Sequence, residues 1–234
     1  MGWGLLPPRR AGGPPPPPPP APEDGGVSLS KVTLTKSDPS VSLTKRGAGG
    51  GQLRVNLQWS TGSAPAKKGL FGKLSDTGSS AIDLDLACLW EFTDGTKGVV
   101  QALGNAFQAP SSGAPIIRLD GDDRSGGNVG GENMFIDLSR VNEIRRVLVF
   151  TFIYEGTPNW AGADGVVTLH PAAGPEIEVR LDDHDPQSRS CVIAMLENQG
   201  GDLVVQREVR YIRGGQGDID RAYGWGMKWA RGSK

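Results

Sequence analysis

The sequence has few residues that bind soft metals or form disulfides: two cysteines and two histidines in 234 residues. Cys88 and Cys191 each lie within an apolar run, no Cys-x-x-Cys pair occurs, and neither histidine is close to a cysteine in the sequence. Zinc sites need thiolate and imidazole ligands at short spacings, so the sequence argues against one. We expect both cysteines to be reduced and buried as small apolar side chains.

The sequence also lacks a long apolar run and a dominant charge. No stretch is long enough to cross a bilayer, and residues 1–10 lack the apolar core of a secretory signal. The 25 basic and 26 acidic side chains give a formal net charge of -1, so no overall field favours nucleic acid or an anionic membrane as partner. We therefore expect a cytoplasmic protein that does not bind nucleic acid.

Familiar catalytic motifs are absent as well. Ser125 lies between Arg124 and Gly126, so there is no Gly-x-Ser-x-Gly elbow, and no glycine-rich loop ends in Gly-Lys-Ser or Gly-Lys-Thr. Paired carboxylates can hydrolyse a glycosidic bond, but the sequence gives neither their separation nor a pocket. A protein without enzymatic activity is therefore the leading interpretation, and a carboxylate-cluster hydrolase is the alternative.

Glycine and proline, in contrast, are abundant, with 35 and 18 residues. This composition favours turns and short strands over long helices. Residues 53–59 and 82–90 alternate apolar and polar positions, and the uniformly apolar run 146–154 is typical of a central strand covered on both faces. Further strand-like runs follow at 166–169, 176–181, 190–196 and 203–212. We predict an all-β fold, a two-sheet antiparallel β-sandwich with a short helix after Gly214 laid over it.

The composition divides the chain into a tail and a domain. Residues 1–26 contain an unbroken run from Pro14 to Pro20, which predicts a disordered proline-rich tail or polyproline II spacer; a ligand for an aromatic groove is the functional alternative. Residues 27–234 are predicted to form one sandwich domain. It opens with three alternating copies of five residues, at 27–31, 32–36 and 41–45, which predict short strands or one hairpin turning at Asp38 and Pro39. Residues 60–80 break the pattern and indicate a disordered insertion, with a contact loop as the alternative.

An acidic, glycine-rich stretch at 119–132 lies between two apolar runs. It carries four carboxylates: Asp120, Asp122, Asp123 and Glu132. Clustered carboxylates repel one another unless something neutralises them, and glycines let a loop fold around a cation, although a solvated turn has the same composition. The stretch is not an EF-hand, because Arg124 stands at the fifth position and Gly131 at the twelfth, where a Glu is required.

A second acidic pair lies in the strand predicted over 82–90. Period-two alternation places Asp83 and Asp85 on one face, with Cα atoms about 6.5–7 Å apart, and the apolar residues on the other. Carboxylates on such a strand need water, a basic partner or a cation. We predict that they join the 119–132 stretch in a composite site for a hard cation, with calcium as the leading candidate. A third acidic run, 182–186 with His184, is interpreted as a turn, with a metal site as the alternative.

These motifs resemble those of a known family. Asp-Leu-Asp at 83–85, Gly-Asp-Asp-Arg-Ser-Gly at 121–126 and Gly-Glu at 131–132, in that order, resemble the TerD-like family of tellurium-resistance and stress proteins, and within it the TerA-type branch most closely. The similarity covers residues 26–226. It implies a calcium-binding β-sandwich in the bacterial cytoplasm, a role in tellurite or chemical-stress response, and association with other family members or with the inner face of the membrane.

The resemblance also implies a ligand set. It assigns Asp83, Asp85, Asp122 and Glu132 to the family's acidic positions, with Asp120 and Asp123 as neighbouring candidates. Where the family commonly has Gly-Asp-Asp-Glu, this chain has Gly130-Gly131-Glu132. Fewer charged ligands weaken calcium binding, so we expect one calcium ion or none. A calcium-dependent sandwich that binds membranes or glycans is a further alternative.

Overall fold

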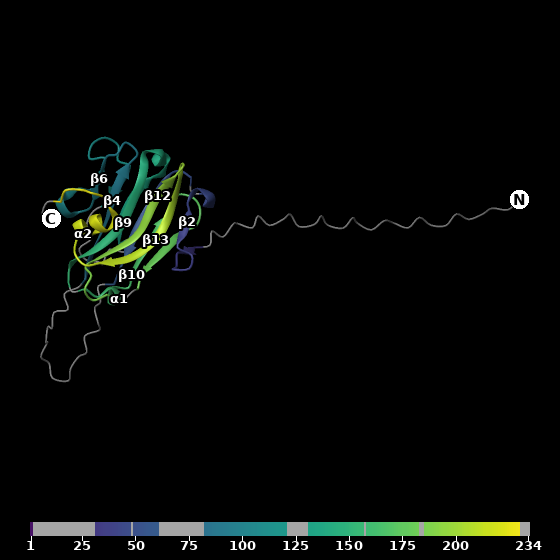
Figure 1. Cartoon of the computed structure of the whole chain (residues 1–234). Helices are drawn as coiled ribbons and strands as arrows, with labels where there is room; N and C mark the ends of the chain where they lie inside the picture. The colour runs from purple at the N-terminus through teal and green to yellow at the C-terminus, as the bar shows by residue number, and fades with distance from the viewer. Residues whose placement is uncertain are drawn as a thin grey trace, which may run out of the picture.

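The structure, a computed structural model, describes residues 1, 31–47, 49–60, 82–120, 131–156, 158–182 and 185–229. Within these ranges, thirteen strands form two sheets that pack face to face, and two short α-helices complete the fold (Figure 1). The predicted all-β sandwich with a short C-terminal helix is confirmed. Residues 2–26 of the predicted tail lie outside the described part of the chain.

Sheet A has seven strands in the order β1-β11-β10-β3-β8-β7-β6. In that order their bounds are Val32–Thr33, Ile177–Leu181, Gly165–His170, Gln52–Gln58, Glu132–Asp137, Ile117–Leu119 and Gln108–Ala109. The edge pair β1 and β11 is parallel, and every other pair is antiparallel.

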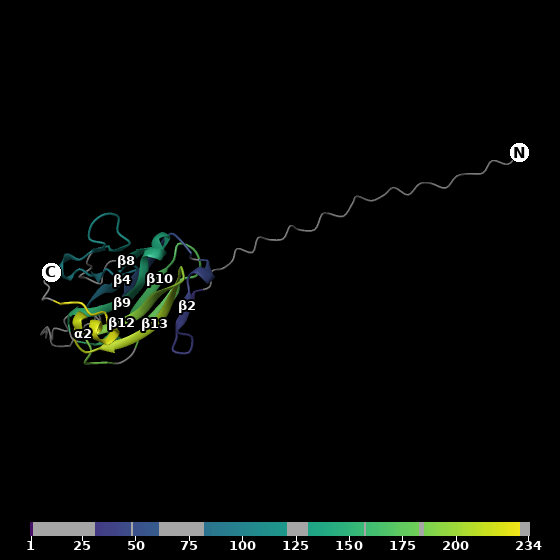
Figure 2. The ribbon, with the colours of Figure 1, turned by 45° about the horizontal axis from the view of Figure 1, so that its top comes forward.

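Sheet B has six strands in the order β2-β13-β12-β9-β4-β5, all antiparallel. Their bounds are Ser40–Ser42, Asp202–Ile212, Ser190–Gln199, Ile144–Glu155, Asp83–Phe92 and Lys97–Val100. The long strands β13, β12, β9 and β4 lie side by side and form most of one layer (Figure 2).

Of the two alternatives predicted for the five-residue copies, short strands are confirmed for the second and third copies, and a hairpin between them is wrong. Val32 of β1 pairs with Ile177 in sheet A, whereas Val41 of β2 pairs with Val205 in sheet B. The two copies therefore cross from one layer to the other. The alternating pattern predicts a strand with one buried face, but it does not say which sheet the strand joins. Residues 27–30 and 61–81 lie outside the described ranges.

Strand β9 is the central strand that the sequence predicts. Val147, Val149 and Ile153 belong to the core between the sheets. The alternate residues Leu148 and Phe150 belong to a second apolar cluster on the outer face of sheet B. Helix α2 (Gln216–Tyr223) and the residues after it cover that face.

Shorter elements connect the strands. They are three 3-10 helices, η1 (Thr44–Arg46), η2 (Leu103–Asn105) and η3 (Leu138–Glu143), and the helix α1 (Trp160–Ala163). Cys88 and Cys191 are buried and form no disulfide, as predicted. Among the described residues, no helix is long and apolar enough to span a membrane.

Candidate functional site

The start of β4, the end of β7 and the start of β8 meet at one end of the sandwich. The backbone N–H of Asp120 donates to the carbonyl oxygen of Asn133 at 2.8 Å, and Glu132 pairs with Leu57 of β3. The indole N–H of Trp59, just after β3, donates to the carbonyl of Ile82, just before β4, at 3.0 Å. The start of the 82–90 strand and the two ends of the 119–132 stretch, which were predicted to share a site, therefore lie in the same part of the fold.

Glu132 faces the interior of the sandwich. Its side chain alternates with those of Asn133 and Phe135 and shares the buried face of β8 with Met134 and Ile136. Its carboxylate oxygen Oε2 accepts a hydrogen bond from the backbone N–H of Leu86 at 2.5 Å. Strand β5 pairs with β4 only from Cys88 onward, so Leu86 lies beyond the end of β5. The Leu86 N–H therefore donates to Glu132 and not to a neighbouring strand.

Asp83 and Asp85 share one face of β4, as predicted. Leu84 and Leu86 belong to the core between the sheets, so period-two alternation directs the two aspartates to the outer face of sheet B. Asp83 is 6% exposed, Asp85 is fully buried and Glu132 is 3% exposed. Buried carboxylates are costly unless charge or hydrogen bonds compensate them, so three of them at one end of the fold are notable.

The described residues do not by themselves complete a metal site. The Asp120 side chain is 54% exposed and lies 3.7 Å from Nη1 of Arg118. No three Asp, Glu, His or Cys side chains in the described ranges are grouped so that they could hold a metal ion. The pleat accounts for this, because Glu132 points between the sheets while Asp83 and Asp85 point outward. Asp122 and Asp123 lie outside the described residues, so the ligand set stays a prediction.

The glycine that precedes Glu132 is required by the fold. Gly131 has φ +61°, and a Cβ atom there would lie 2.1 Å from the carbonyl oxygen of Leu57. Any other residue at this position would force β8 away from β3. The glycine at 131 therefore fits the close approach of these two strands.

Sequence reasoning missed a polar pair beside this end of sheet A. Asn56 of β3 is 4% exposed, and its Nδ2 donates to Oδ1 of Asn133 at 2.9 Å. Asparagine is disfavoured in strands, so Asn56 inside the alternating 53–59 run was a usable signal.

At the 182–186 run, Asp185 accepts hydrogen bonds from the backbone N–H groups of Gln187 and Ser188, as in an ordinary turn. Residues 183 and 184 lie outside the described part.

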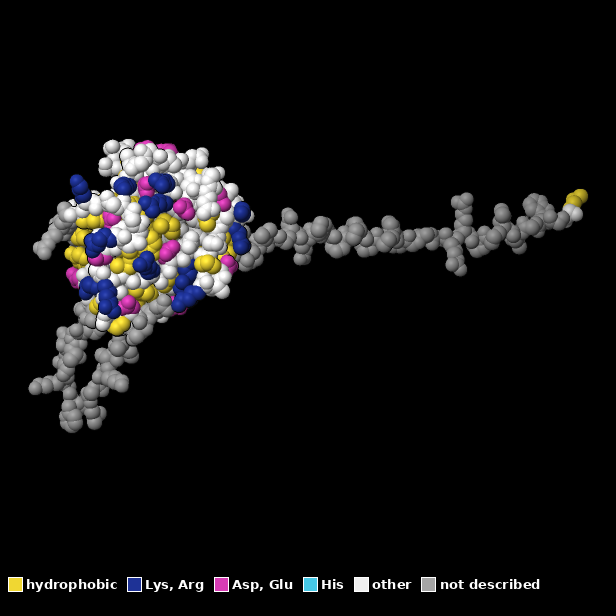
Figure 3. Space-filling view, in the orientation of Figure 1, with side chains coloured by type: hydrophobic (Ala, Val, Ile, Leu, Met, Phe, Trp, Pro, Cys, Tyr) yellow, Lys and Arg dark blue, Asp and Glu magenta, His cyan; other side chains and the backbone are white. Residues whose placement is uncertain are grey.

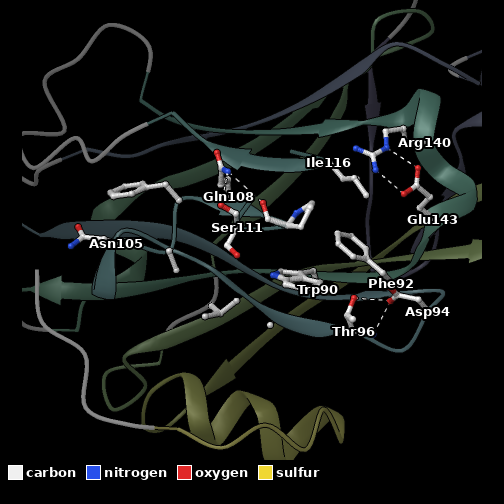
Figure 4. A pocket seen from close by; sticks show the side chains of 15 residues that line it. Trp90, Phe92, Asp94, Thr96, Asn105, Gln108, Ser111, Ile116, Arg140 and Glu143 are labelled. Atoms are coloured by element: carbon white, nitrogen blue, oxygen red, sulfur yellow. Dashed lines mark hydrogen bonds and ion pairs between the residues drawn. The ribbon is translucent and has the colours of Figure 1, made fainter. Parts of the chain in front are cut away.

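A groove of about 540 Å³, which the sequence did not predict, opens where the two sheets end at β5 and β6. Trp90 and Phe92 lie on one side of it, and Gln108 and Ser111 on the other (Figure 4). Arg140 and Glu143 form its far end through two hydrogen bonds of 2.7 Å.

Comparison with known proteins agrees with the resemblance in the motifs. Tellurium resistance protein TerA from Alcaligenes sp is 49% identical over 208 residues, which are 89% of this chain. The chain is a relative of TerA. The predicted resemblance to the TerD-like family, TerA-type branch, is confirmed. The chain spans 60% of the length of this relative. No protein-family model matches the sequence.

Two solved structures are similar to this one. SAV2460, a protein of unknown function, has a TM-score of 0.51 at 18% identity, covering 75% of this chain and 98% of its own; at this identity the likeness concerns the fold alone. A homologue of the telluride resistance protein TerD, SCO6318 from Streptomyces coelicolor A3(2), has a TM-score of 0.46 at 19% identity, covering 72% of this chain and 94% of its own.

Proposed function

We propose that this chain is a non-enzymatic, calcium-binding protein of the response to tellurite and other chemical stress, which acts in the cytoplasm through contacts with related stress proteins or the inner membrane surface. The 49% identity to a protein named for tellurium resistance supports the stress role. The chain spans 60% of the length of that relative, so a role in tellurium resistance for this chain is part of the proposal.

One observation supports the calcium part. Asp83, Asp85 and Glu132 are buried at the end of the sandwich where Asp120 and Gly131, the described neighbours of residues 121–130, also lie. Calcium takes six to eight oxygen ligands and favours carboxylates, and Asp122 and Asp123 within that segment are the further donors that the proposal requires. The donor set is made of hard oxygen ligands, and the two cysteines are buried, so the chemistry suits calcium better than a soft metal.

Thermal melting tests this proposal. The full chain should melt at a higher temperature with calcium than with a chelator, because a ligand that binds only the native state stabilises it, by about 2.7 kcal/mol at a hundred times Kd. Asp85→Asn and Glu132→Gln should lose this shift. Asp38→Asn changes an exposed aspartate of the β1–β2 connection and should keep it. An equal melting temperature with calcium and with chelator would refute calcium binding.

Contact with membranes needs a separate measurement. Pelleting with vesicles of phosphatidylethanolamine and phosphatidylglycerol, with calcium and with chelator, tests the membrane surface as partner. Asp85→Asn distinguishes calcium-dependent attachment from simple charge attraction, since the variant removes a negative charge and should nevertheless bind less. If the wild-type chain stays in the supernatant in both conditions, the membrane surface is not a partner, and related stress proteins remain as the proposed partners.

A further inference from the structure

The groove between β5 and β6 has an aromatic floor. The rings of Trp90 and Phe92 lie with centroids 4.4 Å apart, tilted by 32°. The indole of Trp90 packs closely over Gly98 of β5, where an added Cβ would lie 2.7 Å from the ring. The ring is therefore held in place from below, and Trp90 and Phe92 together line the space that Figure 4 shows.

Hydrogen bonds fix the opposite rim. Nε2 of Gln108 donates to the carbonyl of Ser111 at 3.1 Å, which holds the turn after β6. Nη1 of Arg140 donates to the carbonyl of Ala114 at 2.9 Å, and the same guanidinium pairs with Glu143. The groove is thus lined by groups that the fold positions on both sides.

The indole N–H of Trp90 lacks an acceptor among the described residues. It is buried. The four other tryptophans in the described ranges each donate to a carbonyl or carboxylate: Trp59 to Ile82, Trp160 to Ser188, Trp225 to Trp90 and Trp229 to Asp220. A buried donor without an acceptor is unfavourable, so a ligand that brings an oxygen atom to this nitrogen would gain a hydrogen bond.

Aromatic-lined grooves with a hydrogen-bond donor are the sites that proline-rich segments in the polyproline II conformation occupy in other proteins. Proline has a carbonyl oxygen but no N–H, so such a segment offers acceptors and apolar rings together. This chain carries its own candidate, the unbroken run from Pro14 to Pro20, preceded by Arg9 and Arg10.

The charge of the groove is opposite to that of the residues beside the proline run. The titratable groups that line the groove are Asp94, Glu143 and Arg140, one net negative charge, at the end where η3 approaches the β4–β5 turn. Arg9 and Arg10 add two positive charges beside the proline run. We infer that this groove binds the proline-rich segment 14–20 of a second copy of the chain.

The position of the groove favours a second copy over the same one. Strand β1, which follows the tail, and strand β6 are at opposite edges of sheet A, six strand spacings or about 29 Å apart. β2 and β6 likewise lie on opposite sides of the sandwich in Figure 1. The connection from Pro20 to Lys31 reaches about 36–40 Å fully extended, only about 7–11 Å more than this straight line, which leaves little length for the path around the sheet. A neighbouring molecule has no such limit.

Sedimentation velocity of the full chain over a wide concentration range tests the inference. The average mass should rise with concentration. Replacing the prolines at 14–20 by serine should weaken this association by about tenfold or more, as loss of the principal contact does. Ser111→Arg, at an exposed position on the groove rim, should have the same effect, whereas Ser37→Arg, exposed in the β1–β2 connection, should not.

Nuclear magnetic resonance supplies the site-specific readout. A synthetic peptide of residues 7–22 is titrated into the full chain that carries serine at 14–20, and the indole N–H signals are followed. The Trp90 signal, assigned with Trp90→Phe, should move, and a peptide with serine in place of the prolines should leave it unchanged. A mass independent of concentration, or peptide binding that leaves the Trp90 signal in place, would overturn the inference. Peptide binding at Trp90 without self-association would also overturn it, because a second copy would then not be the occupant.

Discussion

Glu132 of sheet A and Leu86 of sheet B are joined by a buried hydrogen bond, from the Leu86 N–H to the Glu132 carboxylate. The bond ties the two layers together at the end where three buried carboxylates lie. It also means that one oxygen of a proposed calcium ligand is already engaged with the fold. Glu132 therefore has a structural role that can be measured apart from any metal.

Replacing Glu132 by alanine should destabilise the chain even in the presence of a chelator. The buried Leu86 N–H would lose its acceptor, which costs about 1–3 kcal/mol. Glutamine keeps an acceptor oxygen, so Glu132→Gln should lose less. Urea unfolding of both variants, with Glu197→Ala on the exposed face of β12 as control, measures the difference. Equal losses for Ala and Gln would show that the hydrogen bond is not what Glu132 contributes.

Gly131→Ala should be more harmful than an alanine at another glycine with positive φ. At Gly131 the new Cβ would lie 2.1 Å from the Leu57 carbonyl, whereas at Gly95, with φ +84°, nothing lies within 4 Å. Gly95→Ala should cost about 1 kcal/mol through backbone strain alone, and Gly131→Ala about 2 kcal/mol more. Chemical denaturation of the two variants compares them, and similar losses would mean that β3 and β8 separate easily at this point.

Side-chain periodicity predicted the parts of the fold that depend on burial. It placed Asp83 and Asp85 opposite Leu84 and Leu86, and it identified β9 as covered on both faces, because alternation reports directly on which side of a strand is apolar. It failed where partners are chosen over long distances. The pattern at 32–36 and 41–45 is the same, yet the two segments join different sheets.

The candidate sites were predictable to different extents. The carboxylates at the end of the sandwich could be identified from the sequence, because aspartate is disfavoured in strands and clustered carboxylates in one stretch repel one another. Their mutual placement was not visible, because it depends on which face of β8 carries Glu132 and on the pairing of β3 with β8. The aromatic groove had no sequence signal, since Trp90 of β4 and Gln108 of the edge strand β6 come from different sheets.

Asp220 should anchor the segment that follows α2. It is 4% exposed and accepts hydrogen bonds from the backbone N–H groups of Gly226 and Met227 and from the indole of Trp229, at 2.7, 2.8 and 2.9 Å. Asp220→Ala removes all three, so we expect a loss of about 2–4 kcal/mol and faster trypsin cleavage after Lys228. Asp218→Ala, on the exposed first turn of the same helix, should cost about 1 kcal/mol and leave cleavage unchanged. Equal cleavage rates in the two variants would show that Asp220 does not hold the segment.

Glu91 should make stability depend on pH in the acid range. Burial alone would raise the pKa of this carboxyl, but the hydrogen bond and charge of Arg146, together with the charge of Arg145, outweigh burial and hold the pKa below its ordinary value of 4.5. Both arginines lie 2.7 Å from a carboxylate oxygen. Because the unfolded chain binds this proton more readily, the contribution is present above pH 4.5 and is lost as the pH falls through the lowered native pKa.

Urea midpoints measured from neutral pH down to pH 3 should therefore fall less steeply for Glu91→Gln than for the wild-type chain. Glu197→Gln, at an exposed position, serves as the control and should follow the wild type. If the curves for the wild type and Glu91→Gln are parallel, the two arginines do not stabilise the ionised Glu91 carboxylate in the native chain relative to the unfolded chain.

The two cysteines should be unreactive in the native chain. Both are buried, and burial raises the pKa of the Cys88 thiol far above its ordinary value, so the reactive thiolate is not formed near neutral pH. A thiol-specific disulfide reagent should detect no thiol in the native chain and two in guanidinium chloride, with Cys88→Ala reducing the second count to one. Chemical reduction of tellurite by this chain would need an accessible thiolate. A native chain that reacts rapidly with the reagent would therefore argue for thiol chemistry and against a role through contacts alone.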